Sequence, residues 1–139
     1  MTRFIATNGS WSGRDLRGFD FSGMDLLGFD FSDSLLCDAN FAEARLWTSN
    51  FTGSDLSYAN FTGADCSSTI FNGAALQFAS FHGAKLANAH VMLADLRYCN
   101  FNEADLTLAY LMESNIESAT FHKAKFSSTG LANGEMTPP

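Results

Sequence analysis

The sequence predicts an all-β solenoid, in which the chain winds into stacked four-sided coils. Three observations predict it: a five-residue repeat, uniform columns of residues twenty apart, and an alternation of charge with the same spacing. The repeat is plainest between residues 39 and 81. Its large apolar residue, which we call the centre of each unit, recurs every fifth residue from Leu16 to Leu131. These centres make 24 units, and all of them are apolar.

A period of five fits neither a helix nor a flat strand. A helix would scatter the centres around its circumference, and a strand would send them to alternate faces. The chain must therefore turn once per unit. If each unit forms one side of a coil, every centre points to a common axis, and the backbone groups pair with the neighbouring coils.

The identities of the centres indicate four sides to a coil. With three sides, residues fifteen apart would stack, and Phe would lie over Leu. With four sides, residues twenty apart stack, and 24 units make about six coils. From Ser34 to Thr129 the residue two before each centre is Ala, Ser, Thr or Cys, as expected where large centres fill the axis. The columns are then uniform, one being Phe21, Phe41, Phe61, Phe81, Phe101 and Phe121 and another Leu36, Leu56, Leu76, Leu96 and Ile116.

A column of charges supports the same count. Stacking of residues twenty apart would place opposite charges on neighbouring coils, about 4.8 Å from one another. Exposed pairs of this kind contribute only about 0–1 kcal/mol each, so we interpret the column as structural. The residues are Asp25, Arg45, Asp65, Lys85, Asp105 and Lys125.

The pattern resembles that of the pentapeptide-repeat family, A-(D/N)-L-x-x, from about Arg14 to Asn133. This resemblance implies a right-handed quadrilateral β-helix, and the handedness comes from the family alone. Glycines recur two residues after the centre, where a corner requires a positive φ. They are Gly18, Gly23, Gly28, Gly53, Gly63, Gly73 and Gly83.

The chain is predicted to be one domain with two atypical ends. Residues 1–13 form an N-terminal cap or an imperfect first coil, residues 14–133 the β-helix, and residues 134–139 a C-terminal tail whose prolines discourage end-to-end strand pairing. In the first regular coil Phe19, Met24 and Phe29 stand where later coils have small residues. We expect them to plug the end of the core; the alternative is a contact surface for another chain.

Two surface features are candidate sites. From Ile70 onward one side is unusually apolar, with Leu108 at a corner, which suggests contact with another protein or a second copy of the chain. Its residues are Ile70, His90, Met92, Leu93, Tyr110 and Met112. The N-terminal end is acidic, although aspartates before a centre commonly bond to the backbone of a turn. This patch comprises Asp15, Asp20, Asp25, Asp30, Asp33, Asp38 and Glu43.

A second aromatic column, Tyr58, Phe78 and Tyr98, is interpreted as stacking within the fold.

No catalytic constellation is evident, and a filled solenoid offers no water-excluding pocket, so we expect neither enzyme activity nor a cofactor. Three cysteines do not make a disulfide framework, and His82 and His122 would lie about 9.6 Å apart, too far to share a metal. No run of about 18 apolar residues or signal-peptide layout is present, so a cytoplasmic protein is expected.

Two functions remain open. The first is a non-catalytic protein-interaction module or scaffold. The second follows from the resemblance, because some pentapeptide-repeat proteins are acidic mimics of duplex DNA that bind DNA gyrase. The net charge of −7 argues against direct binding of nucleic acid and fits such a mimic in sign. It is only about half of the roughly 15 phosphate charges on DNA of the same length.

Overall fold

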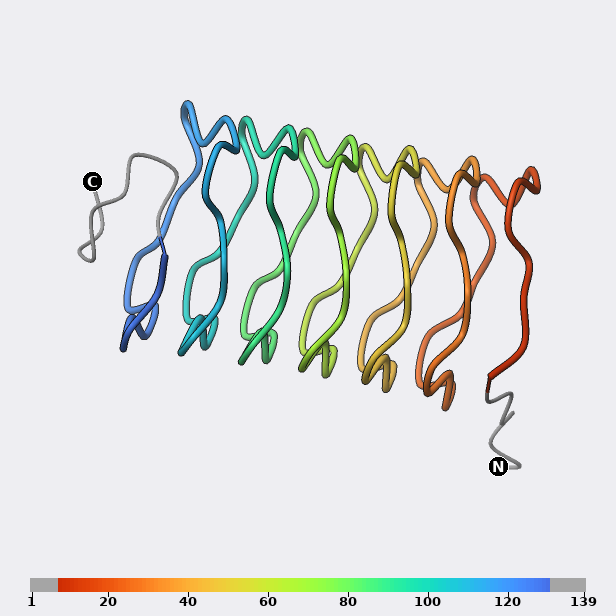
Figure 1. The fold of residues 1–139 in the computed structure, drawn as a ribbon, viewed down its shortest axis with the longest axis horizontal. Coiled ribbons are helices and arrows are strands. Elements are labelled where there is room, and N and C mark those ends of the chain that lie inside the picture. Colours follow the sequence, from red (N-terminus) through yellow and green to blue (C-terminus); the bar gives the residue numbers. More distant parts are fainter. Residues whose placement is uncertain (1–7, 131–139) are drawn as a thin grey trace.

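The chain winds around one long axis, with stacked coils between its two ends (Figure 1). This computed structural model describes residues 8–130. Within that range the sides of the coils are too short to form extended strands, and each side contributes one isolated bridge residue between two-residue turns. The predictions for Leu131, for the tail at 134–139 and for residues 1–7 lie outside the described residues.

Parallel backbone pairing joins residues twenty apart throughout the described chain. The bridges run from Ser10–Asp30 to Tyr110–Gly130. Hydrogen bonds follow the same spacing on both sides of each bridge residue: the N–H of Phe41 donates to the carbonyl of Asn60 at 2.7 Å, and the N–H of Asn60 donates to that of Ala39 at 3.0 Å. Four five-residue units therefore separate stacked residues, as the uniform columns predicted.

The phenylalanine column lies in a single line along the axis. The ring of Phe61 stacks on Phe41 at 5.0 Å and on Phe81 at 4.8 Å, with 3° between planes in each case. Phe51, on the adjoining side of the coil, meets Phe61 edge to face at 5.7 Å and 89°. Both arrangements suit the ring quadrupole, so the two columns support one another. All of these rings are buried.

The small inward residues also bond to the backbone. The hydroxyls of Ser49, Ser54 and Thr69 donate to carbonyls 23 residues earlier, at 2.7, 2.7 and 2.6 Å respectively. The Sγ of Cys99 makes the same contact with Leu76 at 2.8 Å. Because a buried hydroxyl without a partner is costly, these bonds explain how Ser and Thr replace Ala inside the coil.

Every corner has the same backbone conformation. The residue two after each centre has a positive φ, whether it is glycine, as at Gly73 (68°), or not, as at Tyr58 (61°) and Leu93 (58°). The N–H of the next residue closes the turn onto the carbonyl of the centre, as Ala44 does onto Phe41 at 3.0 Å. The prediction for the glycines is confirmed. That non-glycine residues adopt this conformation too, at a cost of about 1–2 kcal/mol each, was not predicted from the sequence.

The N-terminal end differs in part from the predicted plug. Trp11 packs against the ring of Phe29 at 4.7 Å, and Phe29 is buried. Met24 is partly buried against the core. Phe19 lies 6.1 Å from the ring of the core residue Phe21 but is 52% exposed, so it covers the end of the core only in part. Since Ser10 already pairs with Asp30, the imperfect first coil includes the last residues before the regular units.

We predict that Gly73→Ala lowers the free energy of unfolding by about 1 kcal/mol, measured by urea denaturation. No atom lies within 4 Å of the position of the new Cβ, so the loss comes from the positive φ alone. Gly130→Ala is the control, because Gly130 has no positive φ and its Cβ would meet Met112 at an ordinary 3.6 Å. Equal losses in the two variants would contradict this explanation.

Candidate functional site

The predicted apolar residues lie together on one side of the solenoid and its two corners. We call this group the Tyr110 patch; Ile70, His90 and Tyr110 follow one another along a bridge column. The rings of His90 and Tyr110 stack at 5.2 Å. Leu93 and Met112 occupy the corner beyond, where the N–H of Leu93 donates to the carbonyl of Met112 at 3.3 Å.

The patch is open to solvent at its C-terminal end. Leu93 is 65% exposed, Tyr110 42% and Met112 38%. Leu108, at the opposite corner of the same side, is 44% exposed. Ile70, His90 and Met92 are half-buried beside them. These exposed and half-buried residues share one side of the solenoid and its corners, and whether they bind a partner stays a prediction.

The acidic residues serve the corners more than they form a shared site. Asp20 and Asp30 accept the backbone N–H groups of Ser22 and Ser32 at 3.0 and 2.9 Å, and hydrogen bonding by the side chain and then the backbone of these serines lowers the pKa of each carboxyl. Asp25 is buried. The remaining predicted residues are Asp15, which pairs with Arg17 at 2.7 Å, and the exposed corner residues Asp33, Asp38 and Glu43.

The charge column stacks as predicted, with parallel bridges from Asp25 through to Lys125. Its first pair is in direct contact, since Nη1 of Arg45 lies 3.2 Å from Oδ2 of Asp25. Arg45 is 44% exposed at its side chain, so a modest contribution to stability is expected. The alternating signs reduce the negative field of this side of the solenoid.

The aromatic column stacks in register at another corner and is confirmed as a ladder. Ring centroids of Tyr58 and Phe78 lie 4.9 Å apart with 4° between planes, and those of Phe78 and Tyr98 lie 4.7 Å apart with 2° between planes. About half of each residue is exposed. A hollow of about 390 Å³ opens beside the ladder, a feature that the sequence did not predict. It is lined by Asp55, Ser57, Tyr58, Ala75, Gln77, Phe78, Arg97 and Tyr98.

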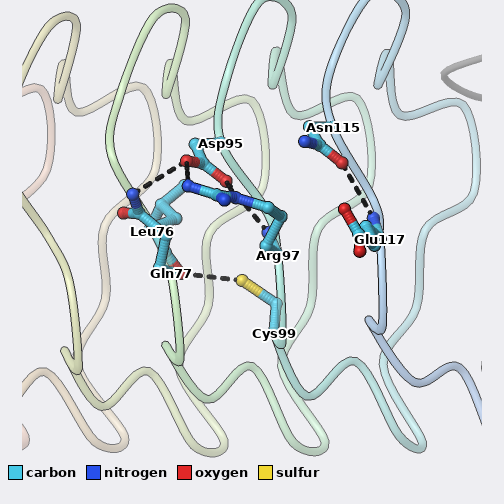
Figure 2. Close-up of polar contacts among 7 residues, drawn as sticks. All are labelled: Leu76, Gln77, Asp95, Arg97, Cys99, Asn115 and Glu117. Carbon is cyan, nitrogen blue, oxygen red and sulfur yellow. Dashed lines mark hydrogen bonds and ion pairs between the residues drawn. The ribbon is translucent and has the colours of Figure 1, made fainter.

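A polar cluster borders this hollow (Figure 2). Arg97 donates from Nε to Oδ1 of Asp95 at 2.9 Å and from Nη2 to Oδ2 at 2.7 Å, while Nε2 of Gln77 donates to Oδ2 at 2.8 Å. The hydrogen bonds from Arg97 hold the pKa of Asp95 below its usual value. In this fold, an arginine two residues after a bridge aspartate can therefore close back onto its carboxylate.

Across residues 8–130 the other titratable residues do not gather into a centre. Cys66 and Cys99 are buried, and burial raises the pKa of the Cys99 thiol to about 12. His82 lies 3.2 Å from Glu103 at an exposed corner. Between residues 8 and 130 no group of three side chains is placed to hold a metal ion. No helix of membrane-spanning length and apolarity occurs in that same range.

The repeat decides the family. The family model for pentapeptide repeats matches residues 15–53, 49–88 and 92–127, with eight copies. The chain belongs to the pentapeptide-repeat family. Among curated proteins, none is significantly similar to it in sequence.

Several solved pentapeptide-repeat structures are similar to this chain. Trypsin-treated QnrB1, a plasmid-mediated fluoroquinolone resistance protein, is 23% identical, with a TM-score of 0.59 over 92% of this chain and 74% of that one. This likeness supports the shared solenoid fold. A protein from the Arabidopsis thaliana thylakoid lumen is 32% identical, with a TM-score of 0.42, and the match covers 86% of this chain and 62% of that one. HetL, involved in heterocyst differentiation regulation in the cyanobacterium Nostoc, is 20% identical, with a TM-score of 0.39 over 96% and 89% of the two chains.

We predict that the Asp95 cluster stabilises the protein at neutral pH and that this contribution is lost in acid. Because the folded-state pKa of Asp95 is lowered, its contribution is present above the unfolded pKa of about 3.9 and is lost as the pH falls through the folded value. Asp95→Asn should therefore have a lower free energy of unfolding than the wild type at pH 7, and this difference should shrink as the pH falls below about 4. Urea denaturation at each pH measures it. Arg97→Gln should remove the larger part of this pH dependence, because the Arg97 side chain is the main cause of the lowered pKa of Asp95. Parallel curves for Asp95→Asn and the wild type across this range would contradict the prediction.

Proposed function

We propose that this chain is a non-catalytic protein-interaction module that binds through the Tyr110 patch. The observation that supports this is the exposure of four large apolar residues, Leu93, Leu108, Tyr110 and Met112, on one side of the solenoid and its corners. Outward positions in the earlier coils of the same side are mostly Ser, Thr, Asn and Asp. A contiguous apolar surface within a polar one is typical of a site of protein contact.

The partner that we propose is a second copy of the chain. Tyr and Met are enriched in protein interfaces, and Met side chains adapt to the shape of the opposite surface. Two copies related by a two-fold axis would each present the same patch, so a single apolar surface is sufficient. We infer from the family that the patch is presented on a right-handed quadrilateral β-helix of about six coils.

We predict that Tyr110→Glu combined with Met112→Glu abolishes self-association in sedimentation velocity at high protein concentration. The introduced carboxylates would have to lose water in the interface. Both positions are exposed, so the coil should stay folded. Ser12→Glu with Ser32→Glu is the control, because it adds the same charge in the column of Met112 at the other end. A monomeric wild type, or an equal loss in the control, would exclude the dimer.

A second candidate function is binding to DNA gyrase by an acidic surface that imitates duplex DNA. The net charge of −7 on a rod-like solenoid favours it. The exposed carboxylates of Asp20, Asp33, Asp38 and Glu43 supply the negative surface at the N-terminal end. The ion pairs of Asp15 and Asp25 with arginines reduce that surface, which weighs against mimicry along the whole rod.

Mimicry predicts that the purified protein inhibits gyrase supercoiling of relaxed plasmid at micromolar concentration, because the protein would occupy the DNA-binding surface. Asp33→Asn with Asp38→Asn and Glu43→Gln should weaken that inhibition, since it removes three exposed negative charges. The Tyr110→Glu, Met112→Glu variant keeps those carboxylates and serves as the control. No inhibition by the wild-type protein at this concentration would remove the gyrase candidate.

A further inference from the structure

Three aspartates share the bridge column beside the aromatic ladder, and one of them lacks the cation that the other two have. Asp15 is held by Nε and Nη2 of Arg17 at 2.8 and 2.7 Å, as Asp95 is held by Arg97. Asp55 has Ser57 at the corresponding position, whose hydroxyl and backbone N–H donate to Oδ1 at 2.6 and 3.1 Å. Among residues 8–130 no Lys, Arg or His forms an ion pair with Asp55.

Space for a missing cation is present beside Asp55. The hollow of about 390 Å³ adjoins this carboxylate, and the next residue in the bridge column is Ala75, whose methyl group leaves the gap between Asp55 and Asp95 open. Tyr58 and Phe78 form the aromatic wall. This volume is sufficient for one long side chain, with an acceptor and an aromatic surface beside it.

The charges around the hollow favour a cationic guest. Arg97 also lines it, but this guanidinium is engaged by both oxygens of Asp95, and Glu117 lies close enough to help raise its pKa. Asp38 precedes Tyr58 in the ladder column and is exposed. The surface is therefore negative on balance, consistent with the net charge of −7, and would attract a basic partner.

We propose that the hollow beside Asp55 binds an arginine side chain of a protein partner. The guanidinium takes at Asp55 the place that Arg17 and Arg97 occupy at their own aspartates. Its planar fork matches a carboxylate, and its stem and flat face lie against Tyr58 and Phe78. The hollow is on a different side from the Tyr110 patch. Binding of an arginine side chain there therefore does not require the proposed dimer.

The test is an NMR titration with the blocked peptide acetyl-Gly-Arg-Gly-amide, and with its lysine analogue, up to tens of millimolar. We expect saturable shifts of the amide signals of Asp55, Tyr58 and Ala75 with the arginine peptide, and weaker binding of the lysine peptide. Asp55→Asn should weaken binding about tenfold, as for loss of a charge-assisted contact. Asp65→Asn is the matched control: Ser67 donates to Asp65 at 2.7 and 3.2 Å, but Asp65 does not line the hollow. Circular dichroism checks that each variant is folded.

A second variant fills the hollow from within. Ser57→Arg places an arginine two residues after Asp55, as in the Asp15 and Asp95 pairs, and should abolish peptide binding while Asp55 remains. Ser67→Arg makes the same change on another side and should leave binding intact. The proposal is overturned by the absence of saturable shifts, by equal affinity for the lysine peptide, by equal weakening in Asp55→Asn and Asp65→Asn, or by full binding in Ser57→Arg. Shifts explained by self-association of the chain in sedimentation would overturn it too.

Discussion

The structure depends on parallel backbone pairing between residues twenty apart. The N–H and carbonyl of each bridge residue bond to the coil before it, and the two residues that flank it bond to the coil after it, so a corner of a different shape would disturb the register of every later pair. This constraint accounts for the uniform corners. Tyr58 and Leu93 adopt a backbone conformation that ordinarily favours glycine, because the pairing on both sides of the corner stabilises it. The packed column of rings along the axis adds to the same register.

The sequence predicted the inside of the solenoid better than the outside. Columns such as Phe41, Phe61 and Phe81 could be read directly, because like rings twenty residues apart stack closely along the filled axis. The positive φ at Tyr58 had no residue-type signal. The exposure of Phe19 could not be predicted because spacing fixes the direction of a side chain but not what covers it at the end of a stack. The Tyr110 patch was located because its apolar residues recur in phase where polar ones are usual.

The hollow beside Asp55 was missed for a different reason. The hollow is open because two positions beside Asp55 carry small residues. Ala75 stands where a long side chain would fill it, and Ser57 stands where the other two aspartates have an arginine. A comparison of all outward columns at the twenty-residue spacing would have placed Ala75 between Asp55 and Asp95. The bonding of that cluster required coordinates, because the spacing alone does not say which aspartate an arginine closes onto. The number of aspartates likewise overstated the acidic surface, since Asp15, Asp25 and Asp95 are engaged by arginines.

The uniform five-residue corner has a consequence for how such a chain can change its surfaces. Insertion or deletion of one unit would keep each centre pointing at the axis but rotate everything downstream by a quarter turn. The residues of the Tyr110 patch would then stack over a different side of the earlier coils. Columns such as Phe41 and Phe61 would be interrupted at the inserted or deleted unit. Only changes in multiples of twenty residues preserve every neighbour. Duplication of whole coils is therefore the route by which this architecture can lengthen without rearranging what it displays.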